Sequence, residues 1–328
     1  MNLHNISEAV EIEIRTYAEL IKGGGLVAFP TETVYGLGAS AWNPEAIRKV
    51  FEYKGRPSDN PLIVHISRYS HLLTLAAEIP QDSRLLMQKF WPGPLTLIFE
   101  KKPQVLDSVS AGLNSVAVRM PDHIYALKLI DMTGPLVAPS ANKSGRPSPT
   151  KVSHIQIDFD KRVPILDGGP CEIGLESTVL DVRTQPFRIL RPGRITPKMI
   201  FERTGILVET VDLDAFTDKP ASPGMKYSHY APIAKVRWMN GNELQGNFTN
   251  EKILFLTQKN FSMPTHSFSQ AINFGGDLMK MSRELYDWFR ISDASDFMEV
   301  AIEPFDRLDN HEMYSVLMNR IVKAMGKS

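Results

Sequence analysis

Short apolar runs and amphipathic segments alternate along the chain. Over residues 7–22 the apolar positions recur at helical spacing, and the glycines 23–25 follow as a cap and turn. The next run, residues 26–29, is continuously apolar and predicts a buried strand. Pro30 ends this strand, because proline has no N–H to donate to a neighbouring strand.

The same alternation continues to residue 205 and predicts one complete α/β domain. Asn43–Pro44, Thr150 and Thr196–Pro197 have the residue types that begin helices, and Gly205 has the type that ends one. Helices are predicted at residues 44–53, 68–77 and 82–90, from residue 151, and from residue 197. Strands are predicted at residues 62–66, 95–99, 115–120, 135–141, 163–166, 179–182 and 187–191, the last two as a hairpin.

The pattern changes after residue 205 and restarts at residue 234. Residues 206–211 predict a strand, and residues 218–224 have the composition of a linker. The Ser-His-Tyr-Ala-Pro segment that follows carries aromatic and imidazole groups, which predicts that it packs against another part of the protein. A second, smaller βαβ-type domain is then expected from strands at 236–238, 253–256 and 299–302 and helices at 277–290 and 311–324.

The loop after the first strand carries the first candidate chemistry. Thr31, Glu32 and Thr33 can hydrogen-bond a polar ligand, and Gly36 and Gly38 allow close backbone approach or a turn with positive φ. Open α/β sheets bind ligands where strands run into such loops. An ordinary exit from a strand is the alternative interpretation.

Two basic positions suggest an anionic ligand. Lys54 offers a point charge and Arg56 a planar fork that can grip phosphate oxygens, although a solvated basic loop would have the same composition. Arg119 lies within an apolar strand and needs a partner, which is either a structural carboxylate or a bound anion. His65 also lies in an apolar strand, where a histidine is usually structural.

The segment 140–150 places serine, asparagine and basic groups just past a strand. It is not a Walker A motif, because Asn142 stands where that motif has a glycine before Lys143. No nucleophile elbow or paired metal-binding histidine motif is present, and Cys171 has no catalytic signature around it. From the residues alone, the chain is predicted to be a nucleotide-using transferase.

Composition narrows the class further. The fractions of apolar and charged residues, 43% and 23%, are those of a soluble globular protein, and no apolar run is long enough to span a bilayer. The formal net charge is zero, so no tight nucleic-acid binding is expected. The single cysteine and the absence of a signal-like N-terminus predict a cytoplasmic location.

Four stretches closely resemble the YrdC-domain family, the L-threonylcarbamoyladenylate synthases. They are Pro30–Gly38, Lys54–Arg56, Ser140–Asn142 and Glu176–Thr178. The second and third contain the family's K-x-R and S-x-N signatures, and the Ser-His-Tyr-Ala-Pro segment is similar to that of the long, two-domain form.

The resemblance implies a fold and a division of the chain. It predicts an α/β fold with a twisted, open mixed sheet flanked by helices, followed by a smaller Rossmann-like α/β domain. It implies a catalytic domain at residues 1–205, a linker packing over the active site at 206–233, and a C-terminal domain at 234–328.

The resemblance also implies a reaction. L-Threonine, bicarbonate or CO2, and ATP would give threonylcarbamoyl-AMP and pyrophosphate, with Mg²⁺ accompanying ATP. A complex that transfers the threonylcarbamoyl group to tRNA, forming N6-threonylcarbamoyladenosine, would take the product. The substrate itself supplies the nucleophile as a threonine carbamate, which explains why none is evident in the protein.

Residue roles follow from the family's motifs. L-Threonine is expected at Thr33, His65, Arg119, Ala138 and Ser177, with Arg119 pairing the carboxylate. ATP is expected at Arg56, Asn60, Ser115, Ser140, Ser148, Arg191 and Tyr230. The signature residues Lys54, Arg56, Ser140 and Asn142 are the expected catalytic set, and no metal ligand can be assigned.

Two other classes use the same domain. A carbamoyltransferase of the hydrogenase-maturation type would carry an acylphosphatase-like module and cysteine-rich zinc motifs, which a single cysteine argues against. A non-catalytic RNA-binding module is disfavoured by the neutral charge balance.

Overall fold

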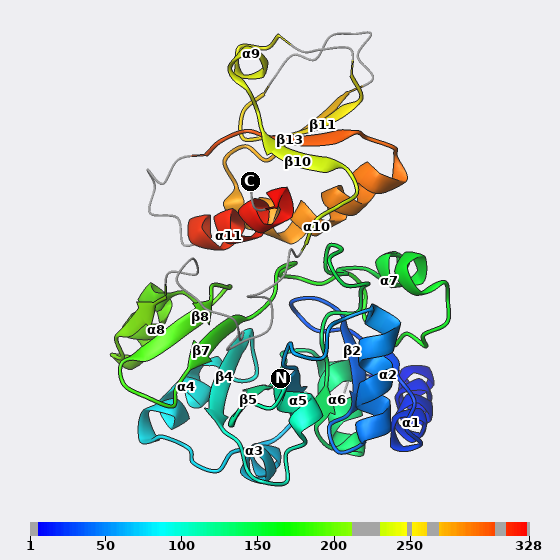
Figure 1. Cartoon of the computed structure of the whole chain (residues 1–328), viewed down its shortest axis with the longest axis vertical. Coiled ribbons are helices and arrows are strands. Elements are labelled where there is room, and N and C mark those ends of the chain that lie inside the picture. Colours follow the sequence, from blue (N-terminus) through cyan, green and yellow to red (C-terminus); the bar gives the residue numbers. More distant parts are fainter. Residues whose placement is uncertain (1–5, 212–229, 248–250, 261–268, 306–312, 327–328) are drawn as a thin grey trace. The chain divides into compact units, whose positions relative to one another are not determined.

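The computed structural model of the chain describes residues 6–211, 230–247, 251–260, 269–305 and 313–326 (Figure 1). The chain divides into two compact units, one of Met1–Ser144 with Ser148–Tyr227 and one of Gly145–Pro147 with Ser228–Ser328. The strand predicted at residues 206–211 is confirmed at residues 208–210. Residues 208–210 are a strand of the first unit's sheet, and three residues of the loop after Asn142 belong to the second unit.

In the part of the chain that the structure describes, the first unit has one mixed sheet of nine strands. Their order is β1-β2-β6-β3-β5-β4-β7-β8-β9. The pairs β3–β5, β4–β7 and β8–β9 are parallel and the other neighbours are antiparallel. The strands are β1 (Val27–Phe29), β2 (Gly36–Ser40), β3 (Ile63–His65), β4 (Leu95–Glu100), β5 (Ser115–Arg119), β6 (Leu136–Val137), β7 (Thr178–Asp181), β8 (Phe187–Arg191) and β9 (Val208–Thr210).

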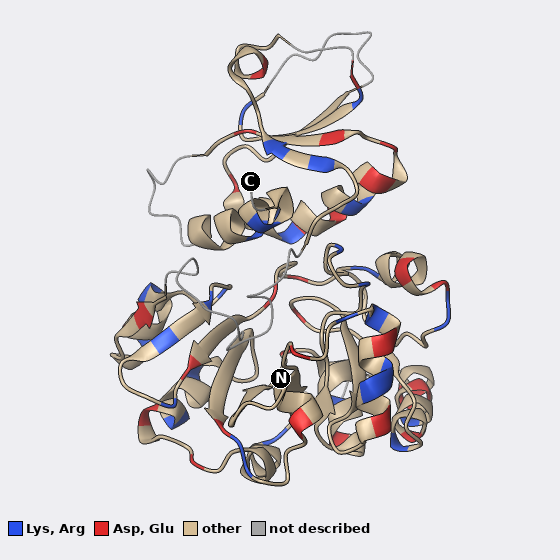
Figure 2. Ribbon diagram, in the orientation of Figure 1, with Lys and Arg blue, Asp and Glu red and all other residues tan. Residues whose placement is uncertain are grey.

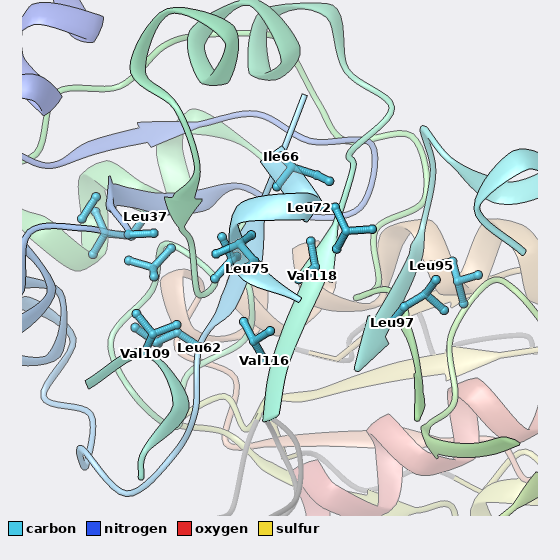
Figure 3. Packing of buried hydrophobic residues seen from close by; sticks show 14 of the residues in the cluster. Leu37, Leu62, Ile66, Leu72, Leu75, Leu95, Leu97, Val109, Val116 and Val118 are labelled. Carbon is cyan, nitrogen blue, oxygen red and sulfur yellow. The ribbon is translucent and has the colours of Figure 1, made fainter. Parts of the chain in front are cut away.

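Helices cover both faces of this sheet. On one face, α1 (Glu8–Lys22) and α6 (Ile124–Thr133) bury their apolar stripes against Phe29 and Leu136. The larger core on the other face includes Leu37, Val64, Val118 and Leu97, and Figure 3 shows part of it. The helices packed there are α2 (Pro44–Lys54), α3 (Tyr69–Leu75), α4 (Gln81–Phe90), α5 (Asp107–Ser110), α7 (Val152–Phe159) and α8 (Pro197–Thr204).

Most predicted helix ends are confirmed. The Asn43 side chain accepts from the Ala46 N–H at the start of α2, and Thr196 caps α8 in the same way. The prediction for Thr150 is wrong, because α7 begins after Lys151. The Thr150 N–H donates to His154 Nδ1 and its carbonyl accepts from the Cys171 N–H, so both backbone groups are used in other contacts.

Three strand predictions need correction. Residues 36–40 form β2, the antiparallel partner of β1, rather than part of a loop. Residues 163–166 are not a strand and form only a bridge between Ile165 and Ala28, and β6 is two residues long. A short apolar run indicates that a segment is buried, but a buried segment need not pair as a strand. The pattern therefore predicted strands that are absent or shorter in the described structure. The helices α5 and α6 were not predicted.

Among its described residues, the second unit has a four-stranded parallel sheet in the order β10-β13-β11-β12. Its strands are β10 (Lys235–Trp238), β11 (Ile253–Thr257), β12 (Gln270–Asn273) and β13 (Glu299–Ile302), and its helices are α9 (Gly241–Leu244), α10 (Leu278–Ala294) and α11 (Tyr314–Met325). The predicted stripe of α10 is buried, at Leu278, Met281, Leu285 and Phe289. This parallel sheet with its helices confirms the smaller Rossmann-like domain.

Strand alternation gives the first unit's sheet a polar surface. Val64, Leu97 and Val118 point into the larger core, so the residues beside them in sequence point to the opposite face. That face carries a small apolar cluster of Ile63, Ile98, Ala117, Val179 and Leu190. The same alternation places His65, Thr96, Ser115, Arg119 and Ser177 on it.

Charges are interspersed rather than segregated on the described surface helices. Figure 2 shows acidic and basic residues alternating along α2, where Arg48 pairs with Glu45 and Glu52. In the described ranges, no helix is both long enough and apolar enough to cross a membrane.

Candidate active site

The loop between β1 and β2 is closed by its own threonines. The Thr31 hydroxyl accepts from the N–H groups of Thr33 and Val34, both at 3.2 Å, and donates to the Val34 carbonyl at 2.6 Å. Thr33 Oγ1 lies 2.9 Å from Thr31 Oγ1, so Thr33 is held by a hydrogen-bonded turn. Thr31 and Thr33 are both buried.

Gly38 serves close packing. Neither Gly36 nor Gly38 has a positive φ, so the expected alternative of a left-handed turn is wrong. A Cβ at Gly38 would lie 2.8 Å from Phe29 Cε1, closer than a real Cβ atom approaches. The phenylalanine ring therefore fills the space that a side chain would need.

Arg119 is the centre of a buried polar cluster. Its Nη1 donates to Thr33 Oγ1 at 2.8 Å, and its Nε donates to the Gly93 carbonyl at 3.2 Å. Its Nη2 lies 2.6 Å from Glu32 Oε2, and both side chains are about 5% exposed. Of the two partners that the sequence left open, the structure contains the carboxylate.

The Glu32–Arg119 pair is close but poorly aligned. Glu32 Oε2 and Arg119 Nη2 lie 2.6 Å apart, but their contact lacks hydrogen-bond geometry. Neither of these atoms, nor Glu32 Oε1, has a hydrogen-bond partner among the described residues. The contact therefore neutralises charge but leaves hydrogen-bonding capacity, which a polar ligand could use.

His65 lies beside Arg119, because β3 and β5 pair in parallel with these two residues in register. Burial, and then the positive charge of Arg119, lower the pKa of His65 to about 3. The imidazole is therefore neutral at physiological pH. Its Nδ1 has no hydrogen-bond partner in the described part of the chain, and its ring meets the edge of Phe29.

Ser177 and Arg191 contact each other across the β7–β8 hairpin. The Arg191 guanidinium donates to the Ser177 carbonyl at 2.9 and 3.1 Å and to its hydroxyl at 3.0 Å. The same hydroxyl lies 2.8 Å from Thr96 Oγ1. Thr96 was missed from the sequence, although a polar residue in the apolar run of β4 was a usable signal.

Lys54 joins the two signatures. Its Nζ donates to the carbonyls of Ser140 and Asn142, each at 2.6 Å, and the Ser144 N–H donates back to the Lys54 carbonyl. Lys54 is 2% exposed. The K-x-R lysine therefore holds the backbone of the S-x-N loop, a role that its residue type did not predict.

Gly55 turns the chain between Lys54 and Arg56 with a φ of +62°, which favours glycine. Arg56 Nη2 donates to the carbonyls of Asn60 and Pro61, at 3.3 and 3.0 Å. The Asn60 side chain is fully buried, and neither its oxygen nor its nitrogen has a hydrogen-bond partner among the described residues. A buried amide of this kind is a candidate ligand contact.

The remaining expected residues lie as follows. Ser148 donates to Glu176 Oε1 at 2.6 Å, which ties the S-x-N loop to the Glu176–Thr178 stretch. Ala138 continues β6 beside β3, where its N–H donates to the Ile63 carbonyl. Ser115 begins β5 and is buried on the same face as Arg119.

Tyr230 belongs to the second unit. Its ring stacks on Tyr286 with centroids 5.4 Å apart, and the Arg320 guanidinium lies 5.3 Å above it. Tyr230 is 6% exposed and has a φ of +72°. The two residues before it lie outside the described residues, as does the expected linker segment 218–224.

The only cysteine is buried, and burial raises the pKa of its thiol. This state suits the structural role predicted for Cys171, since a reactive cysteine needs a stabilised thiolate. Within the described residues, no group of three or more His, Cys, Asp or Glu side chains could hold a metal ion.

Comparison with known proteins identifies the family. A family model described as "Telomere recombination" matches residues 19–193, and one described as "Threonylcarbamoyl-AMP synthase, C-terminal domain" matches residues 195–326. The threonylcarbamoyl-AMP synthase of Bacillus subtilis is 42% identical over 96% of this chain and 93% of its own length. That of Pyrococcus abyssi is 39% identical over 98% of this chain and 97% of its own.

The chain belongs to the threonylcarbamoyl-AMP synthase family. A solved structure, the Pyrococcus abyssi Sua5 protein complexed with L-threonine, matches with a TM-score of 0.85 and 38% identity, over 96% of this chain and 95% of that one. The resemblance predicted from the signatures is confirmed, and so is the two-domain form.

The expected site residues are distributed unequally between the two regions of this chain that match the models of the threonylcarbamoyl-AMP synthase family. All of them except Tyr230 fall in the first matched region, residues 19–193. In this chain, His65, Thr33 and Arg119 are brought together, as are Ser177 with Arg191 and Lys54 with Ser140 and Asn142. Their individual roles remain predictions.

Proposed function

We propose that the chain catalyses formation of threonylcarbamoyl-AMP and pyrophosphate from L-threonine, bicarbonate or CO2, and ATP. It would act in the cytoplasm as a nucleotidyltransferase, supplying the threonylcarbamoyl group for N6-threonylcarbamoyladenosine in tRNA. The observation that supports this most directly is the buried cluster around Arg119, in a family with a member solved in complex with L-threonine.

The Arg119 cluster suits the carboxylate of an amino acid. A guanidinium fixed by Thr33 and Gly93 is a preorganised donor for a carboxylate. His65 is neutral and adds no second positive charge, and its Nδ1 can hydrogen-bond the substrate. Ala138 and Ser177 would complete the threonine site.

The reaction then needs no protein nucleophile. The threonine amine bonds to the carbon of CO2 and releases a proton, giving a carbamate. A carbamate oxygen attacks the α-phosphorus of ATP, and the bond from that phosphorus to the pyrophosphate oxygen breaks. Every bond that changes belongs to a substrate, so the protein acts by positioning and by neutralising charge.

The nucleotide would be held by Arg56, Asn60, Ser115, Ser140, Ser148, Arg191 and Tyr230. Lys54 contributes indirectly, because its ammonium fixes the carbonyls of the loop that carries Ser140 and Asn142. Mg²⁺ would enter with ATP, bound through the phosphates and water as Mg²⁺ commonly is.

The first experiment is pyrophosphate release by the purified protein with ATP, Mg²⁺, bicarbonate and L-threonine, omitting each in turn. Release that requires all four is expected. Release without threonine would indicate another acceptor. No release, together with salt-sensitive binding in an RNA titration, would favour the non-catalytic RNA-binding class.

Arg56→Ala tests the nucleotide site. Turnover is expected to fall at least about tenfold, because a charge that stabilises the transition state at phosphorus is lost. Arg48→Ala is the matched control, since Arg48 is an exposed arginine on α2 that pairs with the surface residues Glu45 and Glu52. Unchanged kinetics of Arg56→Ala would remove Arg56 from the site.

A further inference from the structure

The loop that follows the S-x-N signature is shared between the two units. Ser140, Asn142 and Ser148 belong to the first unit, but Gly145–Pro147 belongs to the second. The chain therefore leaves the first unit for three residues and returns directly at Ser148. Ser148 is one of the residues proposed to contact ATP.

Helix α10 holds this three-residue segment. Arg290 Nη2 donates to the Pro147 carbonyl at 2.5 Å, and Arg290 is only 4% exposed. Asp293, one turn further along the helix, pairs through Oδ2 with Arg146 Nη2 at 2.8 Å. The Asp293 side chain is 7% exposed, so this pair is screened less than a surface ion pair.

Asp293 also holds the chain that follows Tyr230. Its second oxygen, Oδ1, accepts from the N–H groups of Ile233 and Ala234, at 2.7 and 3.2 Å. The Ala231 N–H donates to the Gly145 carbonyl at 3.0 Å, which links the two segments to each other. One carboxylate therefore fixes both pieces of chain.

The contacts of Arg290 constrain the neighbouring residue. The Pro147 carbonyl and the Ser148 N–H belong to one planar peptide group and point in opposite directions. An arginine that fixes the carbonyl therefore fixes the direction of the Ser148 N–H. The Ser148 hydroxyl is oriented separately, by Glu176.

We propose that Arg290 and Asp293 are positioning residues for ATP, acting through Arg146–Pro147 on Ser148 and through Ile233–Ala234 on Tyr230. This inference rests on the proposed function and assigns the second unit a role in it. These contacts are expected to affect the binding of ATP, whereas His65 and Arg119, which are expected at L-threonine, lie on β3 and β5.

Asp293→Asn tests the proposal with little change of shape. The amide keeps an oxygen for the N–H groups of Ile233 and Ala234, but places an NH2 group against Arg146, where donor faces donor. The KM for ATP is expected to rise about tenfold, as for loss of one charge-assisted hydrogen bond, with the KM for L-threonine nearly unchanged.

Arg146→Ala removes the other partner of the same ion pair. Because the Arg146 side chain is 30% exposed, this variant is expected to fold even if Asp293→Asn does not. The double variant is expected to show no further rise in KM for ATP, since both changes remove one interaction. Arg283→Ala is the control, because Arg283 is an exposed arginine on the same helix.

ATP binding by calorimetry, without threonine, gives a second readout that does not depend on catalysis. About tenfold weaker binding by both variants supports the proposal even if pyrophosphate release fails for another reason. Equal effects on the KM values for ATP and threonine, or unchanged ATP binding, would overturn it.

Discussion

At the scale of single residues, the site depends on ionisable groups held out of water on one face of a sheet. Arg119 is neutralised by Glu32, and His65 beside it is kept uncharged by burial and by that arginine. The charges of Arg119 and Glu32 cancel and the neutral His65 adds none, so the three side chains together carry no net charge. A carboxylate ligand would therefore compete with Glu32 for the Arg119 guanidinium.

The depressed pKa of His65 predicts a pH dependence of stability. The unfolded chain protonates this histidine below its ordinary pKa of about 6.5, but the folded protein does so only near 3. Between these values the unfolded state binds more protons, so the free energy of unfolding falls as pH falls, by up to about 1.4 kcal/mol per unit.

Urea unfolding of the wild type and of His65→Gln measures this contribution. From pH 7.5 to pH 5, the wild type is expected to lose about 2 kcal/mol more than the variant, which covers the 1.5 units below 6.5. The comparison removes the contributions of other histidines, such as the buried His71 and the half-buried His123, whose pKa values are also lowered. Parallel pH profiles of the two proteins would contradict the assignment.

At the scale of elements, Gly193 follows the end of β8 and packs closely against the start of β7. A Cβ at Gly193 would lie 2.3 Å from the Thr178 nitrogen and 2.6 Å from the Ser177 carbonyl carbon. Backbone atoms cannot move aside as a flexible side chain can. The glycine therefore permits the close approach that lets Arg191 reach the Ser177 carbonyl.

Gly193→Ala is expected to lower the free energy of unfolding by about 1–3 kcal/mol, the usual cost of overpacking. It should also raise the KM for L-threonine, because Ser177 must shift. Chemical denaturation and steady-state kinetics measure the two effects.

Gly241→Ala is the control for this substitution. A Cβ there meets no atom within 4 Å, and alanine favours the first turn of α9. The free energy of unfolding should stay within about 0.5 kcal/mol of the wild type or rise slightly. Equal effects at both glycines would mean that close approach at Gly193 is not the cause.

At the scale of the whole molecule, the chain passes between the two units three times. Breaks fall after Ser144, after Pro147 and after Tyr227. The second unit is therefore not a simple appendage, because it contains part of a loop that begins and ends in the first. Removing the second unit leaves that loop without Arg290 and Asp293.

A fragment that ends before Ser222 is expected to keep a cooperative unfolding transition, because it retains the nine described strands and both helical layers of the first unit. It should lose most of its threonine-dependent pyrophosphate release. Thermal unfolding by circular dichroism and the release assay measure these two properties. A fully active fragment would contradict both the role expected for the linker and the positioning role proposed for Arg290 and Asp293 of α10.

The sequence by itself determined most elements and the family. Helical spacing, the cap residues Asn43 and Thr196, and the pairing of residues 179–182 with 187–191 are local properties, and the structure confirms them. The four stretches that carry the resemblance were sufficient to indicate the family, because each is a short run of residues that can be read directly from the sequence.

The tertiary structure alone decided which groups meet. Lys54 is 86 residues from Ser140, whose carbonyl it binds. Glu32 contacts Arg119 because the β1–β2 loop packs against β5. The assignment of Gly145–Pro147 to the second unit likewise depends on α10, about 150 residues later. Periodicity encodes the conformation and burial of a segment, but the partner of a buried polar group depends on strand order and register across the whole sheet.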